Sequence, residues 1–192
     1  FKDCLSDLDA AIRFGWSRWY PHTKWGDHQP KGPDDWVWFD KEVSLLESLG
    51  ISSHLVLYGW PKWIMDDQDP RPKDMRWAAS DPRWEDLSIE TAWDRYMKKV
   101  AEHYKGRAVI HEIENEPEFD KWDKLPDEYA LFTIRSARVL KKADPSARVM
   151  VNNVYGIPSG LNRRFLEKRG AKHIDIISWH DYHAGWLTDG LG

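Results

Sequence analysis

Five short runs, most of them rich in valine and isoleucine, alternate along the chain with longer segments of helical periodicity. The runs predict strands at 16–21, 51–58, 108–116, 147–154 and 174–180, and the other segments predict helices at 3–14, 35–49, 84–105, 127–143 and 159–170. Strands of this composition are typical of parallel sheets that are covered on both faces. The strict alternation therefore predicts a parallel α/β sheet, either open and doubly wound or closed as a barrel.

Two observations favour the barrel. No glycine-rich phosphate loop follows any predicted strand, which argues against a nucleotide-binding open sheet. Polar and aromatic residues instead gather after the strands, where a TIM barrel carries its catalytic loops. We therefore expect an α/β fold of the (β/α)8 TIM-barrel type. Because 192 residues hold five strands, residues 1–192 are expected to form one partial catalytic domain with about strands 2 to 6, the first strand preceding Phe1 and the last two following Gly192.

Composition limits the partners that the chain can have. The formal net charge is −4, and acidic and basic residues are interspersed, so no basic stripe indicates nucleic acid. No apolar run approaches the ~20 residues that span a membrane, so neither nucleic acid nor a membrane is expected as a partner. Cys4 is the single cysteine and cannot form a disulfide within the chain. With an upstream segment expected before Phe1, the compartment, secretion included, stays open.

The stretch IHEIENEPEF concentrates glutamates in what reads as a buried strand. Glu112, Glu114 and Glu116 alternate, which predicts one common face for the three side chains. Like charges on one face repel, and burial increases the cost, so a purely structural strand is not expected here. A carboxyl group at a barrel mouth can act as a general acid, and Asn115 could donate to a substrate hydroxyl. The alternative is a glutamate on a solvated loop.

These motifs resemble those of clan A retaining glycoside hydrolases, which are TIM barrels. The resemblance runs from about residue 5 to 186. In that clan the fourth strand ends in Asn-Glu, which implies Glu116 as the catalytic acid/base and Asn115 as a substrate-binding residue. The GWSR stretch resembles the second strand and implies that Arg18 supports the nucleophile. The WHDY stretch resembles the sixth-strand His-x-Tyr and implies His180 and Tyr182 as substrate-binding residues.

Within the clan, HEIENEPEFDKW looks most like glycoside hydrolase family 39, which includes β-xylosidases and α-L-iduronidases, although Glu114 stands where that family commonly has an aromatic residue. WPKW resembles the Pro-x-Trp of the same family, and the chain has thirteen tryptophans, a residue whose indole can stack on a pyranose. Trp60 and Trp63 are therefore expected to bind sugar. His22, which lies at a strand end, is expected to bind sugar as well. Packing is the alternative for both indoles.

The resemblance implies a retaining, β-xylosidase-like hydrolase that cleaves oligosaccharides, polysaccharides or glycosides by double displacement without a cofactor. The nucleophilic glutamate is expected on a seventh strand beyond Gly192, so this fragment alone should be inactive. Two alternatives stay open, a non-catalytic carbohydrate-binding barrel and a clan A glycosidase of another family such as family 5. No metal site is predicted, because the H-x-x-H of His180 and His183 lacks the glutamate and helix of a zinc protease. His54 is expected to be structural or peripheral.

Overall fold

The computed structural model describes residues 15–19, 23–64, 69–119, 122–153 and 160–180. The predicted helix at 3–14 and the predicted site residues His22 and Tyr182 lie outside the described residues.

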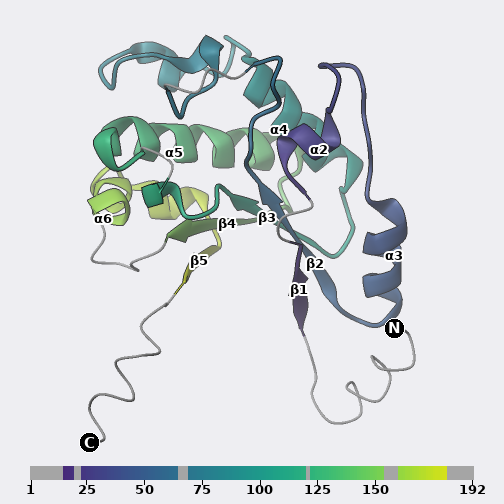
Figure 1. Cartoon of the computed structure of the whole chain (residues 1–192). Helices are drawn as coiled ribbons and strands as arrows, with labels where there is room; N and C mark the ends of the chain where they lie inside the picture. Colours follow the sequence, from purple (N-terminus) through teal and green to yellow (C-terminus); the bar gives the residue numbers. More distant parts are fainter. Residues whose placement is uncertain (1–14, 20–22, 65–68, 120–121, 154–159, 181–192) are drawn as a thin grey trace, which may run out of the picture.

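Five parallel strands form one sheet in the order in which they occur in the chain (Figure 1). They are β1 (Trp16–Arg18), β2 (Ser52–Leu57), β3 (Val109–Ile113), β4 (Arg148–Asn153) and β5 (Ile176–Trp179). Each strand pairs in parallel with the next, and helical crossovers connect them. Sequential parallel strands with helical crossovers are the architecture of a TIM barrel. The predicted fold, a TIM barrel present in part, is confirmed.

The helices match the predicted segments in number and order within the described part of the chain, with one addition. They are α2 (Trp25–His28), α3 (Asp40–Ser48), α4 (Ala92–His103), α5 (Pro126–Ala143) and α6 (Gly160–Glu167). The four-residue α2 was not predicted, because it is too short to show helical periodicity. Five single turns of 3₁₀ helix lie in the connections, η1 (Lys73–Met75), η2 (Pro82–Trp84), η3 (Pro117–Phe119), η4 (Trp122–Lys124) and η5 (Gly170–His173).

Helix α4 begins later than its hydrophobic pattern predicts. Thr91 caps it, because its hydroxyl accepts the N–H of Asp94 at 3.1 Å while the Asp94 carboxylate accepts the N–H of Thr91 at 2.9 Å. This reciprocal capping box defines the helix start. Ile89, which falls within the helix predicted at 84–105, therefore lies before the helix and is 42% exposed.

Aromatic side chains dominate the core. Trp25 stacks on Tyr96 at 5.2 Å, and Trp93 stacks on Phe132 at 5.3 Å between ring centroids. Four tryptophans are almost completely buried, namely Trp25, Trp84, Trp93 and Trp122. Aromatic side chains of this size bury ~150–250 Å² each, so these four are explained by packing.

A buried ion pair joins α4 and α5. Arg135 is fully buried and lies 2.6 Å from the Asp94 carboxylate. Its remaining N–H groups donate to the carbonyls of Arg83, Trp84, Asp86 and Ile89. One guanidinium thereby fastens the connection before α4 to both helices. In the described part of the chain, no helix is both long and apolar enough to cross a membrane.

Candidate active site

The end of β3 departs from regular alternation. The strand ends at Ile113, and Glu114 and Glu116 have φ angles of 64° and 49°. Non-glycine residues rarely adopt this left-handed region, and such residues gather at functional sites. Regular alternation ends at Ile113, so the backbone no longer supplies the basis on which one common face is predicted for the three glutamates. Glu114 lies near Tyr129 of α5, whose pKa is raised by burial and then by the Glu114 charge.

Glu112 is a buried carboxylate held by side chains from three other strands. Its Oε2 lies 2.8 Å from Arg18 Nε of β1 and 2.8 Å from His54 Nε2 of β2. The Ser178 hydroxyl of β5 donates to Oε1 at 3.3 Å. Burial alone raises the pKa of this carboxyl, but the hydrogen bonds and charges of His54 and Arg18 outweigh it and leave the pKa below its usual value. Glu112 is therefore ionised at neutral pH.

Arg18 connects this buried carboxylate with Asn115. Its Nη2 donates to Asn115 Oδ1 at 2.7 Å while its Nε is held by Glu112. Asn115 is 6% exposed, so its side chain is fixed rather than free to rotate in solvent. The structure thus brings together Arg18 and Asn115, two residues that the sequence predicts for one site, through a glutamate that the sequence reasoning did not include.

Glu116 is placed by β4 and by the end of β5. Its backbone N–H donates to Asn152 Oδ1 at 2.9 Å, and its Oε1 lies 2.6 Å from Nδ1 of His180. The side chains of Glu116 and His180 retain 19% and 24% exposure, so a ligand can reach them. Arg18, Asn115, Glu116 and His180 therefore lie at the C-terminal edge of one sheet, where TIM barrels hold their active sites. Their functional roles stay predictions.

Trp60 and Trp63 are half-buried members of the aromatic core. Both contact Trp25 edge-on, at 5.6 and 5.5 Å between ring centroids, and Trp60 also contacts Trp93 at 4.8 Å. The Trp63 indole donates to the carbonyl of Gln29 at 3.1 Å. Packing therefore accounts for their placement, and a sugar-binding role for either indole stays a prediction.

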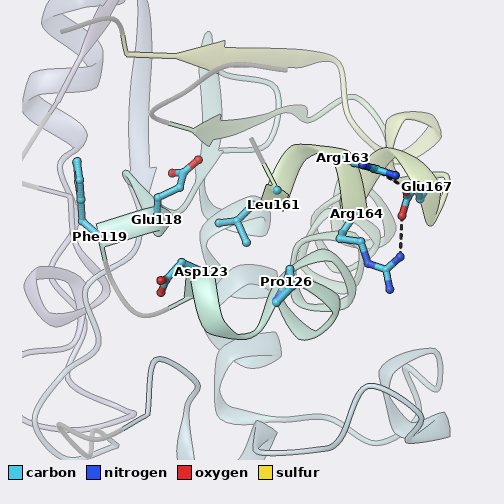
Figure 2. A pocket seen from close by; sticks show the side chains of 9 residues that line it. Glu118, Phe119, Asp123, Pro126, Leu161, Arg163, Arg164 and Glu167 are labelled. Atoms are coloured by element: carbon cyan, nitrogen blue, oxygen red, sulfur yellow. Dashed lines mark hydrogen bonds and ion pairs between the residues drawn. The ribbon is translucent and has the colours of Figure 1, made fainter. Parts of the chain in front are cut away.

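A cavity of about 680 Å³ begins two residues after Glu116 (Figure 2). Its lining comes from η3, η4, the first residue of α5 and the whole length of α6, and consists of Glu118, Phe119, Asp123, Pro126, Gly160, Leu161, Arg163, Arg164 and Glu167. Phe119 is 61% exposed. Arg163 and Arg164 both pair with Glu167, at 2.9 and 2.7 Å. The volume falls within the ~300–1,000 Å³ of small-molecule sites.

Two residues of the site carried a signal that the sequence reasoning left unused. A charged Glu112 in the middle of a buried strand requires a partner, and Arg18 on another strand was the available cation. Asn152 is one of the polar residues that the sequence places at a strand end. Only the structure shows that it contacts Glu116, Ser178 and His180. Among the described residues, no three His, Cys, Asp or Glu side chains are grouped so as to hold a metal ion.

No protein-family model matches the chain, and no curated protein matches it in sequence. Solved structures match it in fold. Xylanase XynB from Paenibacillus barcinonensis superposes with a TM-score of 0.54 at 14% identity, over 93% of this chain and 56% of the xylanase. A β-galactosidase from the haloarchaeon Halorubrum lacusprofundi gives 0.59 at 15% identity, over 94% and 37%.

The exo-β-1,4-mannosidase Op5Man5 from Opitutaceae bacterium strain TAV5 gives a TM-score of 0.54 at 16% identity, over 93% of this chain and 34% of the mannosidase. The chain therefore spans between about a third and just over half of the length of these three enzymes. At such low identities the likeness concerns the fold. The five strands and their helices are part of a TIM barrel of the kind that these glycosidases share.

Proposed function

We propose that this chain belongs to a retaining glycoside hydrolase of clan A and supplies its general acid/base, Glu116. The observation that supports this most strongly is the placing of Glu116 beside His180 at the carboxyl edge of the sheet, with Asn115 fixed next to it by Arg18. The fold likeness to a xylanase, a β-galactosidase and a mannosidase agrees with it. The proposal concerns the complete barrel, of which this chain is a part.

In the proposed first step, protonated Glu116 gives its proton to the glycosidic oxygen while a second carboxylate attacks the anomeric carbon. In retaining enzymes the two carboxyl groups lie ~5–5.5 Å apart. In the second step, ionised Glu116 takes a proton from water while the water oxygen attacks the anomeric carbon. The bond to the nucleophilic carboxylate breaks, the sugar is released, and Glu116 is protonated again. The nucleophile is proposed to be a glutamate on a seventh strand beyond Gly192.

The leaving group is proposed to depart toward the cavity that follows Glu116. A general acid lies beside the bond between the sugar and its leaving group, so the chain that continues from it borders the leaving-group side. Glu118 and Phe119 continue directly from Glu116 into the cavity lining. An exposed phenyl ring there offers a face on which a second sugar or an aromatic leaving group can stack.

Within the clan, the proposed activity is that of a family 39 β-xylosidase. HEIENEPEFDKW and WPKW support this assignment. Glu114 differs from the aromatic residue common in family 39, and here it is buried close to Tyr129.

The test is hydrolysis by a complete barrel containing this chain, with Glu116→Gln as the variant. General acid catalysis contributes ~10²–10⁴-fold, so kcat/KM should fall within that range for xylosides with poor leaving groups. The fall should be much smaller for activated aryl β-xylosides, which need little protonation. Equal losses on both substrates would exclude Glu116 as the proton donor.

Sugar binding without turnover separates the enzyme from a carbohydrate-binding barrel. If the wild-type barrel binds xylo-oligosaccharides in calorimetry but hydrolyses none of the aryl glycosides, the catalytic proposal fails and the binding protein is favoured. Glu118→Gln serves as a matched control, because it removes a nearby carboxylate from the same loop and should keep the leaving-group dependence of the wild type.

A further inference from the structure

The backbone N–H of Glu116 determines which atoms donate and which accept in the hydrogen bonds of the Asn152 side chain. The N–H of Glu116 can only donate, so the Asn152 atom that faces it at 2.9 Å is the carbonyl oxygen. The other end of the same side chain is then the NH₂ group. It lies 3.0 Å from Ser178 Oγ and 3.0 Å from His180 Nε2. Both of these atoms must therefore accept a hydrogen bond.

The same direction determines the state of His180. Because Nε2 accepts from Asn152, it carries no proton, and a neutral imidazole must then carry its proton on Nδ1. Nδ1 lies 2.6 Å from Glu116 Oε1 and donates to it. The bonds close a ring that runs from the Glu116 backbone through Asn152 and His180 back to the Glu116 carboxyl group.

We propose that Asn152 is a positioning residue that holds His180 as the neutral Nδ1–H tautomer and so determines which oxygen of Glu116 carries the transferable proton. Oε1 accepts from His180, which leaves the acidic proton on Oε2. Asn152 is fully buried, so solvent cannot replace its amide. A buried, fully oriented amide is a fixed dipole, and such fixed groups are what hold catalytic side chains in a productive geometry.

Several charged groups surround this ring. Glu116 contacts His180 directly, and ionised Glu112 is connected to Asn152 through Ser178, whose hydroxyl accepts from the amide and donates to Glu112 Oε1. Arg18 of β1 pairs with the charge of Glu112, and the His54 ring of β2 contacts the same carboxylate oxygen. The amide of Asn152 therefore separates two carboxyl groups and adds no charge of its own.

Asn152→Asp tests the proposal because it keeps the shape and the acceptor for Glu116 N–H but replaces the NH₂ donor by an oxygen. His180 Nε2 must then carry a proton to be bonded. Nitrogen-15 NMR of the histidine rings at neutral pH should show a protonated Nδ1 and an unprotonated Nε2 in the wild type, and a protonated Nε2 in the variant. His180→Gln assigns the signal by removing it.

Ser178→Ala is the matched control. It removes the other acceptor of the Asn152 amide without touching His180, so the wild-type tautomer should persist. A protonated Nε2 in the wild-type protein at neutral pH would overturn the proposal, and this measurement needs no variant to fold. An unchanged Nε2 in a folded Asn152→Asp protein would overturn it equally.

The consequence for catalysis rests on the proposed function, whereas the tautomer does not. In the complete barrel, Asn152→Asp should lower kcat/KM for poor leaving groups about 10- to 100-fold, a part of the general-acid effect. The alkaline limb of its pH–rate profile should move to higher pH, because the lost Nδ1–H donor and the added negative charge both disfavour the ionised form of Glu116. A purely structural role would not produce this change. Ser178→Ala should keep the wild-type profile. The predicted tautomer without any glycosidase activity would contradict the proposed function alone.

Discussion

Acidification between pH 7.5 and 5 should destabilise the folded protein through two buried histidines. His28 is fully buried and His111 is 2% exposed. Burial is the main reason why the pKa of each falls from 6.5 to about 4. The unfolded chain takes up a proton on each ring below about pH 6.5, while the folded protein resists it until about pH 4. Stability is therefore intact above pH 6.5 and falls as the pH drops toward 4.

The size of the effect follows from the shift in pKa. One pKa unit corresponds to ~1.36 kcal/mol, so the difference between 6.5 and about 4 is worth ~3 kcal/mol per ring at low pH. A pH of 5 lies ~1.5 units below the pKa of the ring in the unfolded state but still above its pKa in the folded state, so protonation of the unfolded chain gives ~2 kcal/mol per ring. Two rings give ~4 kcal/mol, a large share of the ~5–15 kcal/mol typical of a folded domain.

Urea unfolding followed by tryptophan fluorescence at pH 7.5 and pH 5.0 measures this loss. His28→Gln, which can still donate to the Val37 carbonyl as Nδ1 does at 3.0 Å, should reduce the loss to ~2 kcal/mol. His111→Leu should do the same, and the double variant should remove most of it. His173→Gln is the control, because this ring is only partly buried. A wild-type loss below ~1 kcal/mol, or a full loss in the double variant, would refute the reasoning.

Three further changes test other parts of the structure. Arg135→Met leaves the buried Asp94 carboxylate uncompensated and should cost about 3–5 kcal/mol in urea unfolding, so a cost below about 1 kcal/mol would show that the pair is dispensable. Glu112→Gln removes a charge that bonds Arg18 and should cost about 1.5–3 kcal/mol at pH 7, and an unchanged midpoint would contradict the role assigned to this carboxylate. In the complete barrel, Phe119→Ala should raise KM about two- to tenfold for substrates with a second sugar and leave it unchanged for those with a small leaving group, whereas equal effects on both would place the leaving group elsewhere.

The parallel sheet could be predicted because it follows from local hydrophobic pattern. Most strands are short apolar runs between turn residues, and the covering helices show a buried stripe, so the alternation gives a parallel sheet. The order of the strands followed only from the features that favour a barrel, namely the missing glycine-rich loop and the polar residues after the strands. Helix α5, predicted at 127–143, begins at Pro126 and ends at Ala143. Its first turn has a proline, which is favoured there. Local signals and tertiary packing agree for this element.

The start of α4 and the end of β3 could not be predicted in the same way. The apolar spacing continues upstream through Ile89, so periodicity alone extends the helix past the Thr91 cap. At β3, alternation predicts that Glu116 continues the strand. Its left-handed backbone is held by Asn152, a residue 36 positions away. A contact of this kind depends on the register between strands, which a single sequence does not contain.

The site requires the curvature of the sheet. Glu112 lies on the central strand, and its partners Arg18 and Ser178 come from the first and last strands, each two strands away. Neighbouring strands are ~4.8 Å apart, so in a flat sheet those strands would lie ~10 Å from β3. A long arginine side chain can cross much of that distance, but the short side chain of serine cannot. The contact at 3.3 Å therefore requires β5 to curl toward the concave face.

That curvature connects the fold with the proposed chemistry. The curvature of the sheet places Ser178 beside Glu112. It also places His180, two residues further along the chain, beside Glu116. The Asn152 side chain forms hydrogen bonds with Ser178, with His180 and with the Glu116 backbone. These three bonds form together only when the strands have their curved arrangement. A substitution that flattens the sheet should therefore disturb the contacts of both Glu112 and Glu116. A substitution of Asn152 should disturb the contacts of Glu116 and leave those of Glu112 with Arg18 in place.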